Sequence, residues 1–182
     1  MSIRAKVENI VSGITLDEKI DLKKFASMAS GLEYNPEKFP GVVFRIKKPK
    51  VAMLIFSSGK VICTGARSRE DIDEAVKKLL AKLKEAGIEI KSKPKVEVQN
   101  IVASADLGFE VNLDMLAMEC ENTEYEPEQF PGLVFSLDEP KTVMLIFKSG
   151  RMIITGAKTP EAANEAARKT KEIIESLGVK IS

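Results

Sequence analysis

The side chains that could carry out chemistry in this sequence are few. Histidine, the commonest general acid and base, is absent, and there are only two cysteines, Cys63 and Cys120. In an internal repeat described below, Cys63 matches Ile154 and Cys120 matches Ala29. Apolar counterparts favour small buried side chains over a redox pair or metal ligands. The sequence therefore predicts neither a metal site nor a cofactor.

Carboxylates do not supply a catalytic centre either. An enzyme built from helices and a sheet, as DNA glycosylases are, needs an acid, a base or a nucleophile in one pocket. Asp17, Asp21 and Asp114 have no acidic counterpart in the repeat, and we expect them on helix surfaces. The repeat preserves apolar residues, Asn and Thr instead, so we predict that the protein is not an enzyme.

Paired phenylalanines are a second candidate for function. Phe39 and Phe56 are 17 residues apart, and Phe130 and Phe147 repeat that spacing. A hairpin turn is predicted around Lys48-Pro49, so residues whose numbers sum to about 97 should face each other. We therefore expect the two rings of each pair to meet at one end of their hairpin, where a hydrophobic core is thinnest.

Four predicted strands are apolar on both of their faces. They are Val51–Phe56, Val61–Ala66, Thr142–Phe147 and Met152–Ala157, with only Thr side chains interrupting. An antiparallel sheet normally has one wet face, and two helices per half can cover only the other. The uncovered face would be a large apolar surface, which usually marks an interface. Its few polar groups are Asn9, Asn100, Thr64 and Thr155. Alternatively, the two halves pack face to face and bury it.

These residues belong to a stretch that occurs twice. Glu33–Gly65 reads EYNPEKFPGVVFRIKKPKVAMLIFSSGKVICTG, and Glu124–Gly156 reads EYEPEQFPGLVFSLDEPKTVMLIFKSGRMIITG, 91 residues later without a gap. A repeat this long indicates a duplicated domain half, because solenoid units are shorter and recur at least three times. We predict two similar halves, 1–91 and 92–182, related by a pseudo-two-fold axis.

Hydrophobic periodicity predicts the same elements in each half. The order is a strand, a short helix, three strands and a long helix, which is an α+β pattern. The first half is assigned a strand over 5–16, a helix over 17–30 with Asp17 as its N-cap, strands over 42–46, 51–56 and 60–66, and a helix from Ser68 to Ala86. The second half is assigned strands over 98–107, 133–137, 142–147 and 151–157, a helix over 112–120, and a last helix opening at Thr159-Pro160-Glu161.

Composition is typical of a globular chain, with 182 residues, 44% hydrophobic and 30% charged. No apolar run could span a membrane, and no signal sequence is recognisable, so we expect a cytoplasmic protein. Residues 1–91 hold 18 Lys and Arg against 12 Asp and Glu, whereas residues 92–182 hold 10 against 15. The two halves would therefore present different electrostatic fields to different partners. Alternatively, the charge difference is neutral sequence drift on solvated faces.

At these residues the chain closely resembles the TATA-binding protein family in its compact archaeal form. The resemblance covers nearly the whole chain. The motifs that carry it are Asn-Ile-Val at Asn9 and Asn100, the E-Y-x-P-E-x-F-P-G blocks, Leu-Ile-Phe-x-Ser-Gly, and Thr-Gly-Ala followed by Arg67 or Lys158. Each motif alone is weak evidence, but together they are specific.

The resemblance implies a fold and a function. The fold would be a saddle, in which a curved antiparallel sheet of ten strands straddles double-stranded DNA and four helices lie on the convex side. The function would be that of a general transcription factor, which binds the minor groove of the TATA box and bends it by inserting phenylalanines. Transcription factor B would bind next and bring in RNA polymerase, so the protein would act at the nucleoid.

The resemblance also assigns roles by position. It implies that Phe39, Phe56, Phe130 and Phe147 are wedges, with Pro131 beside one of them. It implies that Asn9, Asn100, Thr64 and Thr155 bond minor-groove acceptors. The apolar floor would be Val11, Leu54, Ile62, Val102, Leu145 and Ile153. The DNA backbone would be contacted by Arg45, Ser58, Lys60, Arg67, Ser149, Arg151 and Lys158.

The acidic loop of the second half is where the resemblance implies the contact with transcription factor B. Its candidates are Glu126 and Glu128, although a solvated acidic loop is an equally open interpretation. Ser136 stands where the first half has Arg45, so one backbone contact should be missing. The remaining alternative is a protein-interaction module, whose apolar face buries against another protein or against a second copy of this chain.

Overall fold

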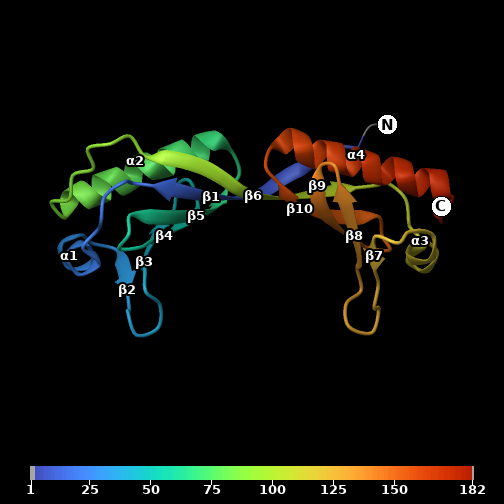
Figure 1. The fold of residues 1–182 in the computed structure, drawn as a ribbon, viewed down its shortest axis with the longest axis horizontal. Coiled ribbons are helices and arrows are strands. Elements are labelled where there is room, and N and C mark those ends of the chain that lie inside the picture. Colours follow the sequence, from blue (N-terminus) through green and yellow to red (C-terminus); the bar gives the residue numbers. More distant parts are fainter. Residues whose placement is uncertain (1–2, 182) are drawn as a thin grey trace. The chain divides into compact units, whose positions relative to one another are not determined.

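The computed structural model describes residues 3–181, and over that range the chain forms ten strands and four helices. Figure 1 shows the elements along the chain. They are β1 (Lys6–Thr15), α1 (Leu22–Met28), β2 (Leu32–Tyr34), β3 (Val42–Ile46), β4 (Val51–Ile55), β5 (Lys60–Ala66), α2 (Arg69–Glu85), β6 (Lys95–Asp106), α3 (Leu113–Glu119), β7 (Thr123–Glu124), β8 (Leu133–Asp138), β9 (Lys141–Ile146), β10 (Arg151–Ala157) and α4 (Pro160–Leu177).

The strand order repeats with the sequence. It is β2-β3-β4-β5-β1 in the first copy and β6-β10-β9-β8-β7 in the second, so each copy of the repeat contributes five antiparallel strands, with the connections in the same sequence. The chain divides into two compact units, which we call the N-terminal unit (Asn9–Gln99) and the C-terminal unit (Met1–Glu8 with Asn100–Ser182). The predicted α+β class, with ten antiparallel strands and four helices in two repeats, is confirmed. The division of the duplication at 91 and 92 stays a prediction.

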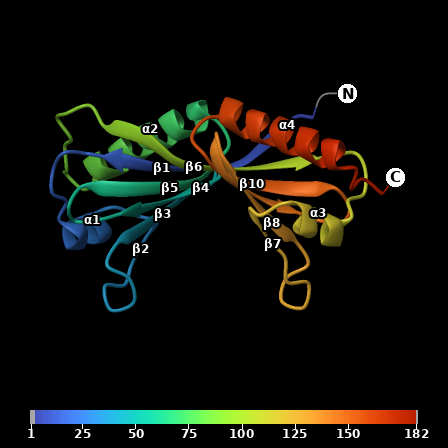
Figure 2. The ribbon, with the colours of Figure 1, turned by 45° about the vertical axis from the view of Figure 1, so that its right-hand side comes forward.

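Strand alternation builds the core of the N-terminal unit. Val42 pairs with Ile55, Ile55 with Val61, and Val61 with Ile14, and all four side chains are buried. Helix α2 covers this face of the strands, as Figures 1 and 2 show. Its fully buried residues are Ile72, Ala75, Leu79 and Leu83. Their spacing of three and four residues places them on one stripe of the helix, which is why α2 can bury one sheet face and no more.

The C-terminal unit repeats that arrangement. Its buried row runs from Leu133 to Ile146, Met152 and Ala105, in register across four strands. Helix α4 packs on this row. The buried side of α4 is unusually small, consisting of Ala163, Ala166, Ala167, Thr170 and Ile174. Small residues let the helix approach the strands closely, and the Thr170 hydroxyl bonds the Ala166 carbonyl at 2.7 Å.

The two long helices have the ends that their sequences predict. Ser68 caps α2 by accepting the Asp71 N–H at 3.2 Å, and Thr159 caps α4 by accepting the Ala162 N–H at 3.0 Å. Gly178 ends α4 in the left-handed conformation, with a φ of 69°. The predicted helices from Ser68 and from Thr159 are therefore confirmed to within one residue at their first turns.

The predicted start of the first helix is wrong. Asp17 does not cap a helix but has a positive φ of 60°, and α1 begins only at Leu22, with Asp21 accepting the Lys24 N–H at 3.1 Å. The intervening segment is held in a bend outside any helix, because the Leu16 N–H donates to the Gly59 carbonyl and the Ile20 N–H to the Ser57 carbonyl. Backbone bonds to the β4–β5 turn therefore override the local helix pattern.

Candidate nucleic-acid interface

The face of the N-terminal unit opposite α2 is apolar and partly exposed. Its central row runs from Val43 to Leu54, Ile62 and Gly13, in register across four strands. Val43, Leu54 and Ile62 are half-buried although no helix of their own unit covers them. Val11 lies on the same face, where it is also half-buried. Alternation therefore leaves on this face the predicted apolar floor.

The C-terminal unit presents the matching row. Val134 pairs with Leu145, Leu145 with Ile153, and Ile153 with Ser104. Ile153 is 38% exposed, which is unusual for a large aliphatic residue in the middle of a strand. Val102 is half-buried on this face. The two units thus each carry a strip of apolar side chains with the width of four strands.

One asparagine and one threonine form the polar group on each strip. In the N-terminal unit, Asn9 Nδ2 donates to Thr64 Oγ1 at 3.1 Å, and Asn9 Oδ1 accepts the Gly65 N–H at 2.6 Å. In the C-terminal unit, Asn100 Nδ2 donates to Thr155 Oγ1 at 3.1 Å, and its Oδ1 accepts the Gly156 N–H at 2.6 Å. Both copies of the repeat therefore keep the same two hydrogen bonds, and not merely the same two residue types.

The paired phenylalanines meet as predicted. The ring centroids of Phe39 and Phe56 are 5.7 Å apart with the planes at 60°, and those of Phe130 and Phe147 are 5.9 Å apart at 64°. Tilted and edge-to-face rings are the geometries that aromatic quadrupoles favour. Phe130 is 43% exposed, which leaves its ring accessible at the loop that follows β7.

A glycine beneath each pair explains the Phe-Pro-Gly motif. A Cβ at Gly132 would lie 2.7 Å from Phe130 Cε2 and 3.0 Å from Phe147 Cε1. At Gly41 it would lie 2.9 Å from Phe39 Cε2. The rings therefore rest on bare backbone, where any other residue would displace them. The proline between, Pro131 in the second copy, is exposed.

Cations border the strip in the N-terminal unit. Arg45 is exposed, and its Nε lies 3.5 Å from the Glu33 carboxylate. Lys60 Nζ donates to Thr15 Oγ1 at 3.2 Å, and the Lys60 N–H donates to Ser58 Oγ at 3.4 Å. Arg67 is exposed directly after β5. The exposed pair with Glu33 contributes little stability, so the Arg45 guanidinium is available to a ligand.

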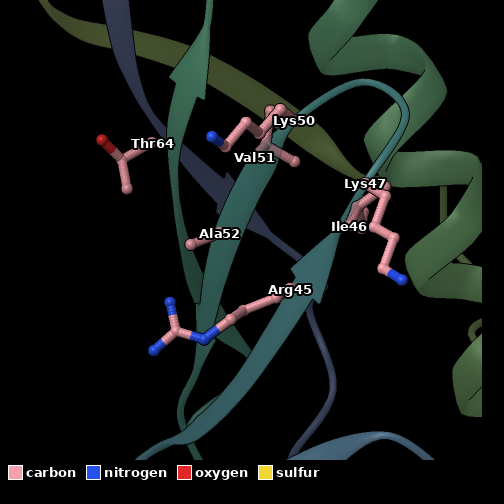
Figure 3. Close-up of a pocket in the computed structure, with 7 residues that line it drawn as sticks. All are labelled: Arg45, Ile46, Lys47, Lys50, Val51, Ala52 and Thr64. Carbon is pink, nitrogen blue, oxygen red and sulfur yellow. The ribbon is translucent and has the colours of Figure 1, made fainter.

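A hollow of about 490 Å³ beside Thr64 is lined by Arg45 and by two further cations, Lys47 and Lys50. Figure 3 shows the Arg45, Lys50, Ala52 and Thr64 side chains on one side of the strands, with Ile46 and Val51 on the other. Ile46 and Val51 are buried, so the first group lies on the partly exposed face. The hollow therefore combines positive charge with an apolar wall next to the asparagine and threonine.

The C-terminal unit carries fewer cations at the same positions. Arg151 and Lys158 are exposed, and the Arg151 N–H donates to Ser149 Oγ at 3.3 Å. Ser136 occupies the register position of Arg45, opposite Val143. The turn that follows, Asp138-Glu139-Pro140, is acidic where the N-terminal unit has Lys47-Lys48-Pro49. These three pairs of positions account for 5 of the 11 charges by which the halves differ, 1 at Arg45/Ser136 and 2 at each of the two lysines.

The acidic loop between β7 and β8 holds the predicted partner residues. Glu126 and Glu128 are both exposed. The Glu126 carbonyl accepts the N–H groups of Gln129 and Phe130, at 2.9 and 3.0 Å. The loop is therefore a tight turn whose carboxylates project into solvent, close in sequence to the exposed Phe130 ring.

The cysteines differ from one another. Cys63 is fully buried, as predicted, and burial raises the pKa of its thiol. The prediction that Cys120 is buried is wrong, because this side chain is only partly buried. Partial burial and the nearby Glu119 charge raise the pKa of its thiol. Within residues 3–181, no cluster of three or more His, Cys, Asp and Glu side chains could hold a metal. None of the helices in that range is long and apolar enough to cross a membrane.

Sequence reasoning missed several residues of the strips. Val43 and Val134 stand beside Leu54 and Leu145 in register, and strand alternation could have found them. Lys50 lines the hollow and was indicated only by its charge. Gly65 and Gly156 belong to the Thr-Gly-Ala motifs, but no sequence signal indicates their bonds to asparagine. The roles of all these residues toward a ligand stay predictions.

Comparisons with known proteins agree with the arrangement. The family model described as transcription factor TFIID, or TATA-binding protein, matches residues 4–86 and 95–177. The TATA-box-binding protein of Archaeoglobus fulgidus is 51% identical over 178 residues, covering 97% of both chains. That of Methanocaldococcus jannaschii is 50% identical over 177 residues, again covering 97% of both. A solved structure, Methanococcus jannaschii TBP, superposes with a TM-score of 0.84 at 49% identity, covering 97% of this chain and 99% of that one.

Proposed function

The chain belongs to the TATA-binding protein family, and from that premise we propose that it is a general transcription factor that binds the minor groove of A·T-rich promoter DNA. It would do so without catalysis, in the cytoplasm and on the chromosome. The observation that carries the proposal is the repeated strip, in which a partly exposed apolar row, an Asn–Thr pair and an aromatic pair recur in both units.

The strip suits the minor groove of A·T pairs for a chemical reason. Those pairs present only acceptors there, adenine N3 and thymine O2, whereas a G·C pair adds the guanine amino donor. Asn9 and Asn100 supply amide donors amid apolar side chains. A guanine amino group pressed against Leu54 or Ile153 would lose its hydrogen bonds to water without replacement, which is costly.

The aromatic pairs support a proposal for bending. In minor-groove binders of this family, apolar wedges enter between base steps, at a cost of a few kcal/mol per step that is offset by the bent duplex covering more protein surface. We propose that Phe39, Phe56, Phe130 and Phe147 are those wedges. Phe130 is the most exposed of the four and rests on Gly132, so its ring needs no rearrangement to be accessible.

The exposed cations would supply the non-specific part of the affinity. Arg45, Lys60, Arg67, Arg151 and Lys158 border the strips, where phosphates of a bound duplex would pass. Ser58 and Ser149 hold the turns before Lys60 and Arg151. Neutralising phosphates releases counterions, so binding should weaken steeply as salt increases.

A partner protein is the further part of the proposal. Glu126 and Glu128 would contact transcription factor B, through which RNA polymerase would be recruited. Their support is exposure on a tight loop whose counterpart in the first half carries Lys38. An apolar strip that waits for DNA could also bury against a second copy of the chain when the protein is free.

The test is competitive binding to two duplexes that differ only in one run of base pairs. One carries a TATA-like A·T run, and the other replaces that run with G·C pairs. We expect the A·T duplex to bind roughly a thousandfold or more tightly, as specific complexes generally do over non-specific ones. Equal, weak and salt-sensitive binding to both would contradict the proposal and favour a protein-interaction module.

A further inference from the structure

The amide of the strip asparagine is held at both of its ends. Asn9 Oδ1 lies 2.6 Å from the Gly65 nitrogen, and Asn9 Nδ2 lies 3.1 Å from Thr64 Oγ1. Asn100 has the same two contacts, to Gly156 and Thr155, at the same two distances. Both halves of the duplication keep this geometry although they differ in most other residues, which indicates a functional arrangement and not a chance contact.

The glycine contact fixes which way the amide faces. A backbone N–H can only donate, so the group that meets it must be the amide oxygen. The amide nitrogen must then lie on the other side of the amide, where Asn9 Nδ2 is 3.1 Å from Thr64 Oγ1. The same hydroxyl is also 3.5 Å from Asn9 Oδ1, so the threonine braces the amide from the side. That nitrogen has two hydrogens, and the bond to Thr64 uses only one of them. With this orientation, Asn9 and Asn100 offer donors to a ligand and keep their acceptors turned inward.

The backbone conformation that turns this N–H toward the asparagine requires glycine. Gly65 and Gly156 have φ values of 104° and 99°, which other residues rarely adopt. A Cβ at Gly65 would lie 2.8 Å from the Lys50 carbonyl oxygen. At the same point the ladder with the neighbouring strand slips register, between Ile10 and Ser12 in one unit and between Ile154 and Ala157 in the other. Such bulges re-aim backbone groups out of the sheet ladder.

We propose that Gly65 and Gly156 are positioning residues that set the base preference of the protein. Their N–H groups lock each asparagine with its donors outward, so that the strip accepts bases that show acceptors and rejects any base that adds a donor. The inference rests on the proposed minor-groove function and deepens it. It assigns the selectivity to a backbone bulge that acts through the asparagine, and not to the asparagine alone.

Aspartate in place of asparagine tests the inference without disturbing the fold. In Asn9→Asp and Asn100→Asp, one carboxylate oxygen still accepts the glycine N–H, but the outward group becomes an acceptor. The probes are duplexes of one TATA-like sequence in which single adenines are replaced by 2,6-diaminopurine, which adds the minor-groove amino group of guanine. The measured quantity is the affinity ratio between the adenine duplex and each diaminopurine duplex.

Wild type should prefer adenine at the positions under Asn9 and Asn100, by roughly 5- to 100-fold, as one well-placed pair of hydrogen bonds allows. The aspartate variants should reduce or invert that ratio at those positions only. Ser136→Asp is the charge control, since it adds a carboxylate to the same face, two strands from Thr155 and without contact to either amide. It should weaken binding to every duplex equally and leave the ratio unchanged.

Amide hydrogen exchange tests the glycine bond directly in the free protein. The Gly65 N–H should be protected in wild type and in Asn9→Asp, and should exchange at least tenfold faster in Asn9→Ala. Unaltered protection in Asn9→Ala, or an unaltered adenine ratio in both aspartate variants, would overturn the inference while the function stood. Wild type without any A·T preference would instead overturn the proposed function, and the inference with it.

Discussion

Single side chains on each strip are held by their neighbours before any ligand arrives. The amide of Asn9 is oriented by a backbone N–H, and the rings of Phe130 and Phe147 rest on Gly132. Preorganisation of this kind lowers the entropy lost on binding, because fewer rotamers must be frozen. The residue scale is therefore where changes too small to unfold the protein should still alter binding.

Gly132→Ala should displace the phenylalanine rings that rest on this glycine. The new Cβ would come within 3.0 Å of both rings of the pair, so Phe130 and Phe147 must separate or tilt. We expect a stability loss of about 1–3 kcal/mol, as for other overpacked sites, and a weaker bend in bound DNA. Urea unfolding and fluorescence transfer across an end-labelled duplex measure the two effects. A variant with unaltered bending would show that the rings do not depend on this glycine.

The two thiols should report their different surroundings. Cys120 is partly exposed and Cys63 is fully buried, so a thiol reagent should modify Cys120 first and Cys63 only when the protein unfolds. A Cys120→Ala variant isolates the slow reaction. Reaction of Cys63 at the rate of a free thiol would contradict the burial.

Raised thiol pKa values also predict a dependence of stability on pH. Burial raises the folded pKa of Cys63 above that of the unfolded chain, so the neutral thiol is favoured by folding. The resulting stability is fully present below the unfolded pKa of about 8.5 and is lost as pH rises through the folded pKa. The stability advantage of wild type over Cys63→Ala should therefore shrink in alkaline buffer, as urea unfolding at several pH values would measure. A constant advantage would exclude the shift.

At the scale of elements, turns are locked by close backbone approach. Gly59 and Gly150 sit in the turns after β4 and β9, and both have positive φ values, 91° and 96°. The segments that follow β1 and β6 cross directly over them. In the first half, these contacts hold residues 16–20 in a bend, so that α1 begins only at Leu22. The turn glycines therefore help to define where a neighbouring helix begins.

Gly59→Ala and Gly150→Ala should be among the most destabilising single changes. A Cβ at these positions would lie 2.2 Å from the Glu18 carbonyl oxygen and 2.1 Å from that of Phe109. We expect losses above about 3 kcal/mol, because neither backbone can move without breaking hydrogen bonds. Gly31→Ala is the matched control: its φ is also positive, at 76°, but nothing lies within 4 Å. It should cost only about 1 kcal/mol. Equal losses at all three sites would refute the steric account.

The elements show how far sequence patterns reach. Helices α2 and α4 are predicted well because Ser68, Thr159 and a periodic apolar stripe all act locally. Strands β2 and β7 have three and two residues and no pattern of their own, so only the family resemblance implied them. The prediction for Asp17 failed because its neighbours Leu16 and Ile20 bond the distant Gly59 and Ser57 carbonyls, which no local pattern reveals.

In the candidate site, too, local patterns predict some features, whereas distant residues determine others. Sequence spacing places Phe39 opposite Phe56, and alternation places Leu54 and Ile62 on one face, because strands have a simple period. The bond from the Gly65 N–H to Asn9 depends instead on a bulge in a strand paired across 56 residues. No local property of Asn9 or Gly65 reveals it.

At the scale of the whole molecule, charge is unequally distributed over a duplicated scaffold. Residues 1–91 have 18 basic and 12 acidic side chains, and residues 92–182 have 10 and 15. Much of the difference lies where Lys47-Lys48 is replaced by Asp138-Glu139, and Arg45 by Ser136. If both units contact one duplex, the first half should contribute more of the phosphate contacts.

Salt dependence should measure this inequality. The logarithm of the binding constant falls with the logarithm of salt concentration by about 0.9 per phosphate neutralised. Arg45→Gln should lower the steepness of that fall by about one contact, and Ser136→Arg should raise it by about one. The base preference should change in neither variant, because a backbone contact reads no sequence. Slopes equal to that of wild type would mean that these positions do not meet phosphates.

The central claim is that the two strips bind and bend A·T-rich DNA through their phenylalanines. The most direct measurement is fluorescence transfer between the ends of a TATA-like duplex, with wild type, Phe147→Ala, and Lys148→Ala as a control at the adjacent exposed residue. We expect wild type and the control to draw the ends together on the A·T duplex but not on its G·C counterpart, and Phe147→Ala to bind weakly with little bending. Binding by wild type that leaves the duplex straight, or bending that survives the loss of Phe147 unchanged, would contradict the account.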